Sequence, residues 1–277
     1  MKIYVSCDME GTAGVCSWSQ CDPENRHEYP TFRRAMTREV AAAIEGAREG
    51  GATQIVVNDS HWSMRNLIPD ELPDDGAVRL VTGAPKPWSM VEGLAQGTDA
   101  ALFTGYHAKA GDAATLAHTF SDDIYRVAVN GVACSEALLN AALAGSYGVP
   151  VVLITGDRTI VQETLHHLPW AVGVAVKDAI GFSAADSLTP GAARLAIRNG
   201  AREAMGRMAR ARPFTFEPPL ELTIETAAVE HADFMELLPG FARAGGRAVR
   251  AVPLDYPSLY ASFVAATRIA GAANQPA

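Results

Sequence analysis

The 277-residue sequence has few cysteines, no excess of positive charge and no long apolar run. Its four cysteines are too few and too irregularly spaced for a disulfide framework, so a reducing cytoplasm is the expected location. The net charge of −8 offers no attraction to nucleic acid or to an anionic membrane, and neither is expected as a partner. No apolar segment approaches the length of a membrane span, and Asp8 interrupts the N-terminal apolar stretch before a secretory signal could form.

The sequence contains enough hydrophobic residues to form a large core. Hydrophobic residues make up 48% and charged residues 19%, which is typical of a compact folded chain. Short apolar runs, expected as strands, alternate with segments of helical spacing; the runs are residues 2–7, 53–58, 78–81, 100–104 and 149–155. A helix is expected over residues 32–49, ending at two glycines. Strands separated by helices predict an α/β fold, with a doubly wound, mostly parallel sheet in three α/β/α layers.

Two segments depart from this alternation. Residues 125–134 show the alternating pattern of a strand on both sides of Asn130-Gly131, a dipeptide that favours type I′ turns. A hairpin near residues 124–134 is therefore expected to protrude from the parallel sheet. A helix is expected from Thr189-Pro190 to about residue 211, and several prolines follow it. The sequence therefore predicts an α/β domain over residues 1–212 and a small α+β subdomain over 213–277, whose last residues, 266–277, are expected to fray.

Side chains that bind metals follow three of the predicted strands. Asp8 and Glu10 come directly after the first strand. His61 follows the second strand, and His107 follows the strand at residues 100–104. Because the strands of an open parallel sheet deliver their loops to one edge, these side chains are expected to meet in one crevice, as in a metal site. The acidic pair alone fits a loop whose carboxylates cap nearby amides equally well.

Two further residues are candidates for the same site. Glu136 begins a predicted helix, where an acid in the first turn complements the helix dipole; the sequence alone favours this role over metal binding. His118 lies eleven residues beyond His107, and histidine as a residue type suits acid–base catalysis near neutral pH. Its position alone fits an ordinary exposed loop histidine as well.

Four short blocks add a more specific signal. They are S-C-D-M-E-G at residues 6–11, N-D-S-H at 58–61, K-P-W-S-M-V-E-G at 86–93 and G-Y-H-A at 105–108. In this order and spacing they resemble the D-aminopeptidases of the dipeptide-transport operon type, a family of zinc peptidases. The resemblance covers most of the chain, and it is strongest over residues 1–180.

The resemblance implies an activity and a set of site residues. It implies an aminopeptidase that hydrolyses the N-terminal residue, a D-amino acid such as D-alanine, from short peptides. Two zinc ions per subunit would activate the attacking water, and His118 would be the catalytic histidine. The implied zinc ligands are Asp8, Glu10, His61, His107 and Glu136. A homo-oligomer that encloses the sites, such as a ring-shaped decamer, is implied as well.

Two other functions compete with this one. The sequence D-M-E-G-T at residues 8–12 is a variant of the D-x-D-G-T opening of haloacid dehalogenase-like phosphatases, in which Asp8 would be a nucleophile that works with Mg²⁺. That hypothesis gives no role to His61, His107 or Glu136, and it needs an aspartate where Glu10 stands. A noncatalytic metal-binding assembly protein would bind zinc without turnover.

Overall fold

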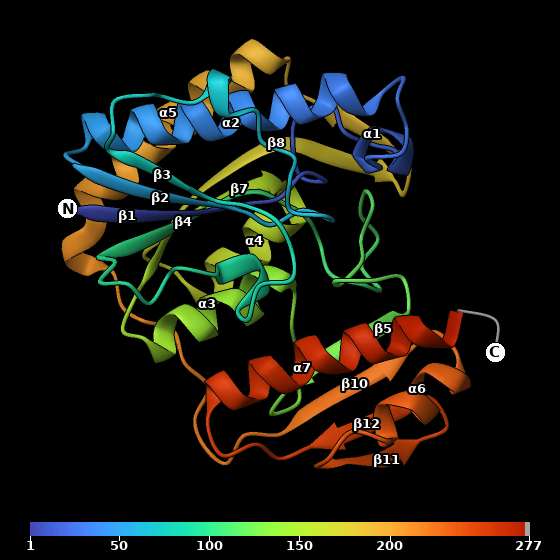
Figure 1. The fold of residues 1–277 in the computed structure, drawn as a ribbon. Helices are drawn as coiled ribbons and strands as arrows, with labels where there is room; N and C mark the ends of the chain where they lie inside the picture. Colours follow the sequence, from blue (N-terminus) through green and yellow to red (C-terminus); the bar gives the residue numbers. More distant parts are fainter. Residues whose placement is uncertain (275–277) are drawn as a thin grey trace.

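A computed structural model describes residues 1–274, and its centre is a seven-stranded sheet (Figure 1). The strand order is β3-β2-β1-β4-β7-β8-β9, and all neighbours are parallel except β8 and β9. The strands are β1 (Lys2–Cys7), β2 (Gln54–Asp59), β3 (Val78–Val81), β4 (Ala100–Tyr106), β7 (Val151–Asp157), β8 (Val172–Gly181) and β9 (Ala184–Ser187). This order confirms the predicted α/β class with a mostly parallel, doubly wound sheet.

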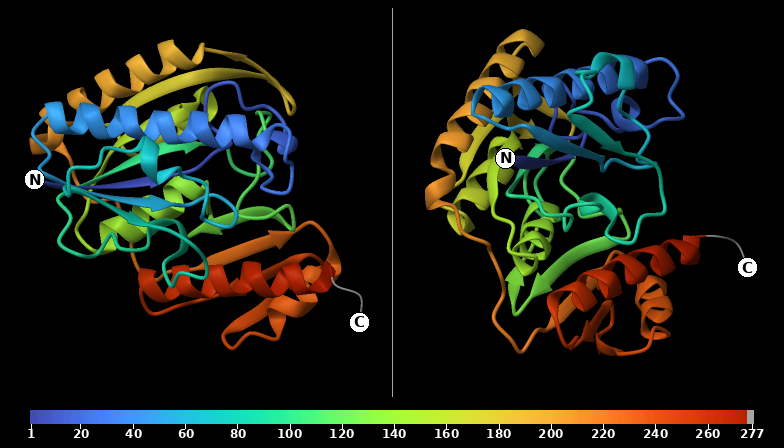
Figure 2. Two further views of the ribbon diagram at one scale, coloured as in Figure 1. Left: turned by 45° about the horizontal axis from the view of Figure 1, so that its top comes forward. Right: turned by 60° about the vertical axis from the view of Figure 1, so that its left-hand side comes forward.

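Helices cover both faces of the sheet (Figures 1 and 2). One face carries α2 (Tyr29–Glu49) and α5 (Pro190–Arg207), and the other carries α3 (Glu136–Ser146) and α4 (Arg158–His167). Side chains of a strand alternate between the two faces. On β1, Ile3 and Val5 accordingly join the core beneath α2, whereas Tyr4 joins the core beneath α3. Both faces are apolar because both are buried, which explains the near-continuous hydrophobic strands.

Helix α2 begins three residues before the predicted start, because Tyr29 and Pro30 belong to its first turn. A proline there costs no hydrogen bond, since the first amides of a helix have no partner within it. A one-turn helix, α1 (Trp18–Cys21), precedes α2 and is held by a capping box between Ser17 and Gln20. Within residues 1–274, no helix combines the length and the apolar character that a bilayer span requires.

A second sheet has five strands in the order β11-β12-β10-β5-β6. Its strands are β5 (Ile124–Val129), β6 (Val132–Ala133), β10 (Leu222–Thr226), β11 (Phe241–Gly245) and β12 (Ala248–Ala251). β5 and β6 form the predicted hairpin, and Asn130 and Gly131 both have positive φ, as a type I′ turn requires. The hairpin lies outside the parallel sheet, as predicted. It is not a free flap, because β5 pairs with β10 along its length.

Helices α6 (Val229–Glu236) and α7 (Tyr256–Ala270) pack against this second sheet, and α7 also contacts α3 (Figure 2). Ala266 and Ala270 of α7 are buried, and a 3-10 turn (Gly271–Asn274) follows the helix. The expectation of a fraying tail is therefore wrong for residues 266–270, which belong to α7, and residues 275–277 lie outside the described part. The division into domains at residues 1–212 and 213–277 stays a prediction. The second sheet combines β5 and β6, which lie before residue 212, with three strands that lie after it.

Candidate metal centre

The fold brings all six predicted site residues to one place. The order of the sheet reverses between β1 and β4, since β2 and β3 lie on one side of this pair and β7 on the other. A crevice at the carboxyl ends of the strands is expected at such a reversal. The loops after β1, β2 and β4 meet there and carry Asp8, Glu10, His61 and His107. Glu136, at the start of α3, and His118, in the loop between β4 and β5, complete the group.

Two glycines allow the loops after β1 and β4 to touch. The Gly11 amide donates to the Gly105 carbonyl at 2.8 Å, and the Asp8 amide donates to the Thr104 carbonyl at the same distance. A Cβ atom on Gly11 would lie 1.8 Å from the carbonyl oxygen of Tyr106, and one on Gly105 would lie 2.1 Å from that of Asp8. Glycine is therefore required on both sides of this contact, which fixes the distance between the two loops.

Asp8 stands at the middle of the group. Its Oδ1 atom lies 3.2 Å from Nδ1 of His61, and its Oδ2 atom lies 3.4 Å from Nε2 of His107. Each histidine also faces a second carboxylate. His61 Nδ1 lies 3.0 Å from Oε2 of Glu10, and His107 Nε2 lies 3.5 Å from Oε2 of Glu136. Asp8 thus presents one oxygen to the His61–Glu10 pair and the other oxygen to the His107–Glu136 pair.

The same geometry shows where the Glu136 side chain lies. Its side chain is buried rather than free at the helix terminus, and the Phe120 amide donates to its Oε1 atom at 2.6 Å. Ser135 is the residue that caps α3, by accepting from the Leu138 amide. Glu136 therefore points into the crevice beside His107, and the interaction with the helix dipole that the sequence favoured is not its main contact.

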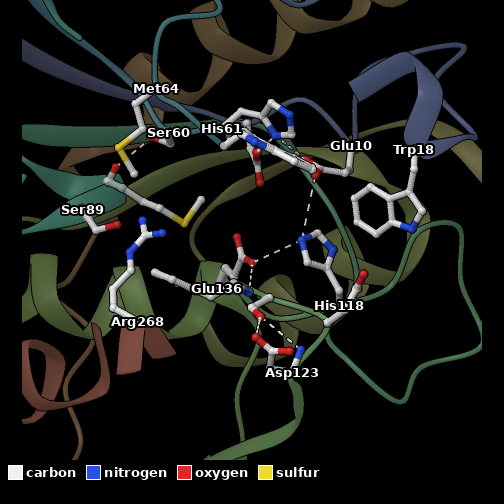
Figure 3. A pocket seen from close by; sticks show the side chains of 16 residues that line it. Glu10, Trp18, Ser60, His61, Met64, Ser89, His118, Asp123, Glu136 and Arg268 are labelled. Atoms are coloured by element: carbon white, nitrogen blue, oxygen red, sulfur yellow. Dashed lines mark hydrogen bonds and ion pairs between the residues drawn. The ribbon is translucent and has the colours of Figure 1, made fainter. Parts of the chain in front are cut away.

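His118 lies between the two outer carboxylates (Figure 3). Its Nε2 atom is 3.9 Å from Oε1 of Glu10 and 4.0 Å from Oε1 of Glu136. Its ring stacks on that of His107 with centroids 4.1 Å apart, and the edge of Trp18 packs against it at 4.9 Å. These contacts place His118 in the site, in contrast to an ordinary exposed loop histidine.

Each of the three histidines is oriented by a backbone carbonyl. His61 Nε2 contacts the Cys21 carbonyl, His107 Nδ1 the Ala108 carbonyl and His118 Nδ1 the Leu116 carbonyl, each at 2.9 Å. A ring nitrogen that donates to a carbonyl leaves the other nitrogen to face the crevice. This arrangement is typical of histidines that bind metals.

Further hydrogen bonds hold the loops that carry these histidines. Asp59 accepts from the Leu67 amide and from the side chain of Asn66, which in turn donates to the His61 carbonyl. Asp59 therefore caps the loop and does not touch the His61 ring. Asp157 caps α4 and also accepts from the Ala108 amide beside His107.

The electrostatics of the group favour cations among its carboxylates. Asp8, Glu10 and Glu136 are each at most 3% exposed, and no lysine or arginine within residues 1–274 pairs with their carboxylates. Burial opposes ionisation of Asp8, but the adjacent imidazoles of His107 and His61 outweigh it and hold its pKa well below the usual range. Burial lowers the pKa of both histidines, but the charges of Glu10 on His61 and of Glu136 on His107 prevail and raise it well above the ordinary value.

The donor set fits metal ions. Oε2 of Glu10 and Nε2 of His107 are buried and have no hydrogen-bond partner among the described residues. Such unsatisfied atoms are rare in proteins and call for a ligand. Three groups among the described residues have ligand atoms within 4.8 Å of one another: Asp8, Glu10 and His107; His107, His118 and Glu136; and Glu10, Cys21 and His61. Carboxylate oxygens and imidazole nitrogens together suit zinc.

The group opens into a pocket of about 450 Å³ (Figure 3). Asp8, Glu10, His61, His118 and Glu136 form part of its wall. The remaining wall combines apolar and polar side chains from several loops and from α7, among them Trp18, Trp62, Met64, Met90, Phe120 and Arg268. A pocket of this size holds a small molecule or a short peptide.

Comparisons with known proteins agree with this geometry. The model of the peptidase family M55, described as D-aminopeptidase, matches residues 1–265. The chain belongs to this D-aminopeptidase family. A D-aminopeptidase of Bacillus subtilis (strain 168) is 33% identical over 271 residues, which cover 98% of both chains. A solved structure, described as the Zn-dependent D-aminopeptidase DppA from Bacillus subtilis, a self-compartmentalizing protease, is similar with a TM-score of 0.94, at 32% identity over 98% of both chains.

Family membership confirms the predicted resemblance and favours the peptidase over the phosphatase. The structure also argues against Asp8 as a free nucleophile, because both of its oxygens face histidines. The chain is therefore a hydrolase of the D-aminopeptidase family.

A buried lysine that was not predicted from the sequence supports the site. Lys177 on β8 is 2% exposed and donates from Nζ to the carbonyl oxygens of Glu10, Thr12 and Val15, the last two at 3.3 and 2.6 Å. It thereby holds the loop that carries Glu10. A lysine at the end of the apolar run at residues 174–176 was the available signal, since lysine is rarely buried without partners.

Proposed function

We propose that this protein is a zinc-dependent aminopeptidase that removes a D-configured first residue, such as D-alanine, from short peptides. The observation that carries the proposal is the position of Asp8, which offers one oxygen to each of two donor sets. Asp8, Glu10 and His61 would hold one zinc ion. Asp8, His107 and Glu136 would hold a second. When bound, zinc polarises a carbonyl group and lowers the pKa of bound water to about 7, so that hydroxide is available at neutral pH.

His118 is proposed as the residue that moves protons. Its Nδ1 atom contacts the Leu116 carbonyl, so Nε2 is the atom that faces the pocket between Glu10 and Glu136. From there Nε2 accepts a proton from the attacking water and returns it to the departing amine. Stacking on His107 and contact with Trp18 keep the ring in that orientation.

The free amine of a peptide needs an acidic or metal anchor, and the pocket offers both, in the metal centre and in Asp122 and Asp123. Recognition of that amine would make the enzyme an exopeptidase. The preference for a D-configured residue is proposed from family membership and from the names of its relatives. A homo-oligomer, such as a ring-shaped decamer that encloses the sites, is proposed because the similar solved structure is described as self-compartmentalizing. A cytoplasmic location is proposed from the scarcity of cysteine.

The decisive experiment measures zinc content and hydrolysis of D-alanyl and L-alanyl dipeptides before and after chelation. We expect about two zinc ions per chain, preference for the D-alanyl substrate, and loss of activity on chelation that zinc reverses. Undiminished activity without metal would refute the proposal. Hydrolysis of a phosphomonoester with Mg²⁺, and not of the peptides, would favour the phosphatase.

A variant pair separates catalysis from metal binding. His118→Ala should keep its zinc and lose activity by at least about 100-fold, because general acid–base catalysis contributes 10²- to 10⁴-fold. His166→Ala, which alters an exposed histidine on α4, should match the wild-type protein. Equal activity of the two variants would contradict the role of His118 and would favour a noncatalytic metal-binding protein.

A further inference from the structure

The pocket contains one cationic side chain that the metal centre does not use. Arg268 of α7 lines the pocket, and it is the single lysine or arginine among the described residues that do so. Figure 3 shows Arg268 and His118 projecting from opposite sides of the pocket. The Arg268 side chain is exposed, so a ligand that enters the pocket can reach it.

Arg268 has no anionic partner among residues 1–274, and the side chain makes no hydrogen bond with them. This is notable because the same pocket is lined by five carboxylates, including those of Asp122 and Asp123. A guanidinium group offers five hydrogen-bond donors in a planar fork that matches a carboxylate. Arg268 is therefore available to an anion that enters from outside.

The position of Arg268 relative to the metal centre is fixed through α7. The Tyr260 hydroxyl donates to Oδ1 of Asn140 at 2.7 Å, and the Asn140 amide donates to the Tyr106 hydroxyl at 3.0 Å. Tyr106 directly precedes His107. Phe263 of the same helix packs against Phe120 with ring centroids 4.8 Å apart. A buried network thus connects the helix that carries Arg268 to the strand that directly precedes His107.

We propose that Arg268 binds the C-terminal carboxylate of a short peptide and so selects free-acid peptides of about two or three residues. The inference rests on the proposed peptidase function. A short peptide carries an amine cation at one end and a carboxylate at the other. Within one pocket, the metal centre would hold the amine end, and Arg268, which projects from the side opposite His118, faces the carboxylate. The pocket of about 450 Å³ limits the distance between the two ends.

The test compares two substrates that differ only at the C-terminus, D-alanyl-glycine and D-alanyl-glycinamide. The measured quantity is the ratio of kcat/KM for the free acid to kcat/KM for the amide. We expect the wild-type enzyme to prefer the acid, and Arg268→Ala to lower the ratio by about 10- to 100-fold, as expected for one lost charge-assisted hydrogen-bonding pair. Most of this loss should appear as a higher KM for the acid. Arg268→Lys, which keeps the charge without the fork, should lose less.

Arg79→Ala is the matched control. Arg79 is also exposed and unpaired among the described residues, and it lies on β3 outside the pocket lining. This variant should keep the wild-type ratio. A wild-type enzyme that cleaves both substrates equally well, or an Arg268→Ala variant that keeps the wild-type ratio, would overturn the role of Arg268 and leave the peptidase function standing. Cleavage of neither substrate by the zinc-loaded wild-type enzyme would overturn both.

Discussion

Zinc binding should release protons from two identified histidines. In the metal-free protein the neighbouring carboxylates, above all Glu10 beside His61 and Glu136 beside His107, outweigh the effect of burial and raise the pKa of both imidazoles well above the ordinary value. Both are therefore protonated at pH 7 in that state. A histidine binds a metal only as the neutral imidazole, so each must give up its proton when zinc enters.

The number of protons released follows from the number of histidines that must lose one. Below the raised pKa values, loading one chain should release about two protons, and the product of the two zinc-binding constants should rise about 100-fold per pH unit. Isothermal titration calorimetry in buffers of different ionisation enthalpy measures the number of protons directly. His61→Ala should reduce the number to about one, whereas His166→Ala, at an exposed position, should leave it unchanged. Zinc binding without proton release would refute the assignment of His61 and His107 as ligands.

The metal-free protein should also lose stability as the pH rises. The folded-state pKa of each histidine is raised, so its contribution is fully present below the unfolded value of about 6.5 and disappears as the pH passes through the folded value. In urea unfolding of the chelated protein, the urea concentration at the midpoint should therefore fall as the pH rises above about 6.5. The zinc-loaded protein should not show this fall, because its imidazoles carry no proton to lose.

Three substitutions test other parts of the site. Glu136→Gln should reduce the zinc content, measured by elemental analysis, to about one ion per chain and should lower kcat/KM by at least about 100-fold. Full zinc content in this variant would contradict the assignment of Glu136 to the second donor set. Gly11→Ala places a Cβ atom 1.8 Å from the Tyr106 carbonyl oxygen and should destabilise the protein by more than about 3 kcal/mol. The control, Gly191→Ala, has its nearest neighbouring atom at 4.0 Å and should not destabilise it. Equal urea midpoints for the two variants would contradict this prediction. Lys177→Met leaves the carbonyls of Glu10, Thr12 and Val15 without their donor and should cost about 3 kcal/mol in the same assay, so a wild-type midpoint would show that water replaces Lys177.

Much of the central sheet was predictable because its strands are locally distinct. β1 and β3 have the predicted bounds, and β2 and β4 differ from the prediction by one or two residues. β4 continues through Gly105 and Tyr106, two residues beyond the predicted end, and its pairing with β7 supports these residues. β8 and β9 were not predicted. β8 is only partly buried and contains Lys177 and Asp178, so it lacks the uniform apolar character of the inner strands.

The long-range partners could not be predicted from local patterns. Nothing in residues 124–134 indicates that this hairpin pairs with a strand at 222–226, since the pairing depends on how the intervening helices pack. The same limit applies to the site. The sequence identified the strand ends that carry Asp8, His61 and His107, but a loop and a helix terminus supply His118 and Glu136. Their positions were implied by family resemblance, and their contacts depend on α3 packing beneath β4.

The second sheet has a consequence for how the chain folds during synthesis. β5 leaves the ribosome about 90 residues before β10, its main partner, which corresponds to roughly 5 to 20 seconds of translation. During that interval Val127 and Val129, buried in the finished protein, have no strand to cover them. The nascent chain therefore exposes an unpaired strand edge next to a nearly complete catalytic crevice, and chaperones that recognise apolar strands have a defined period in which to bind it.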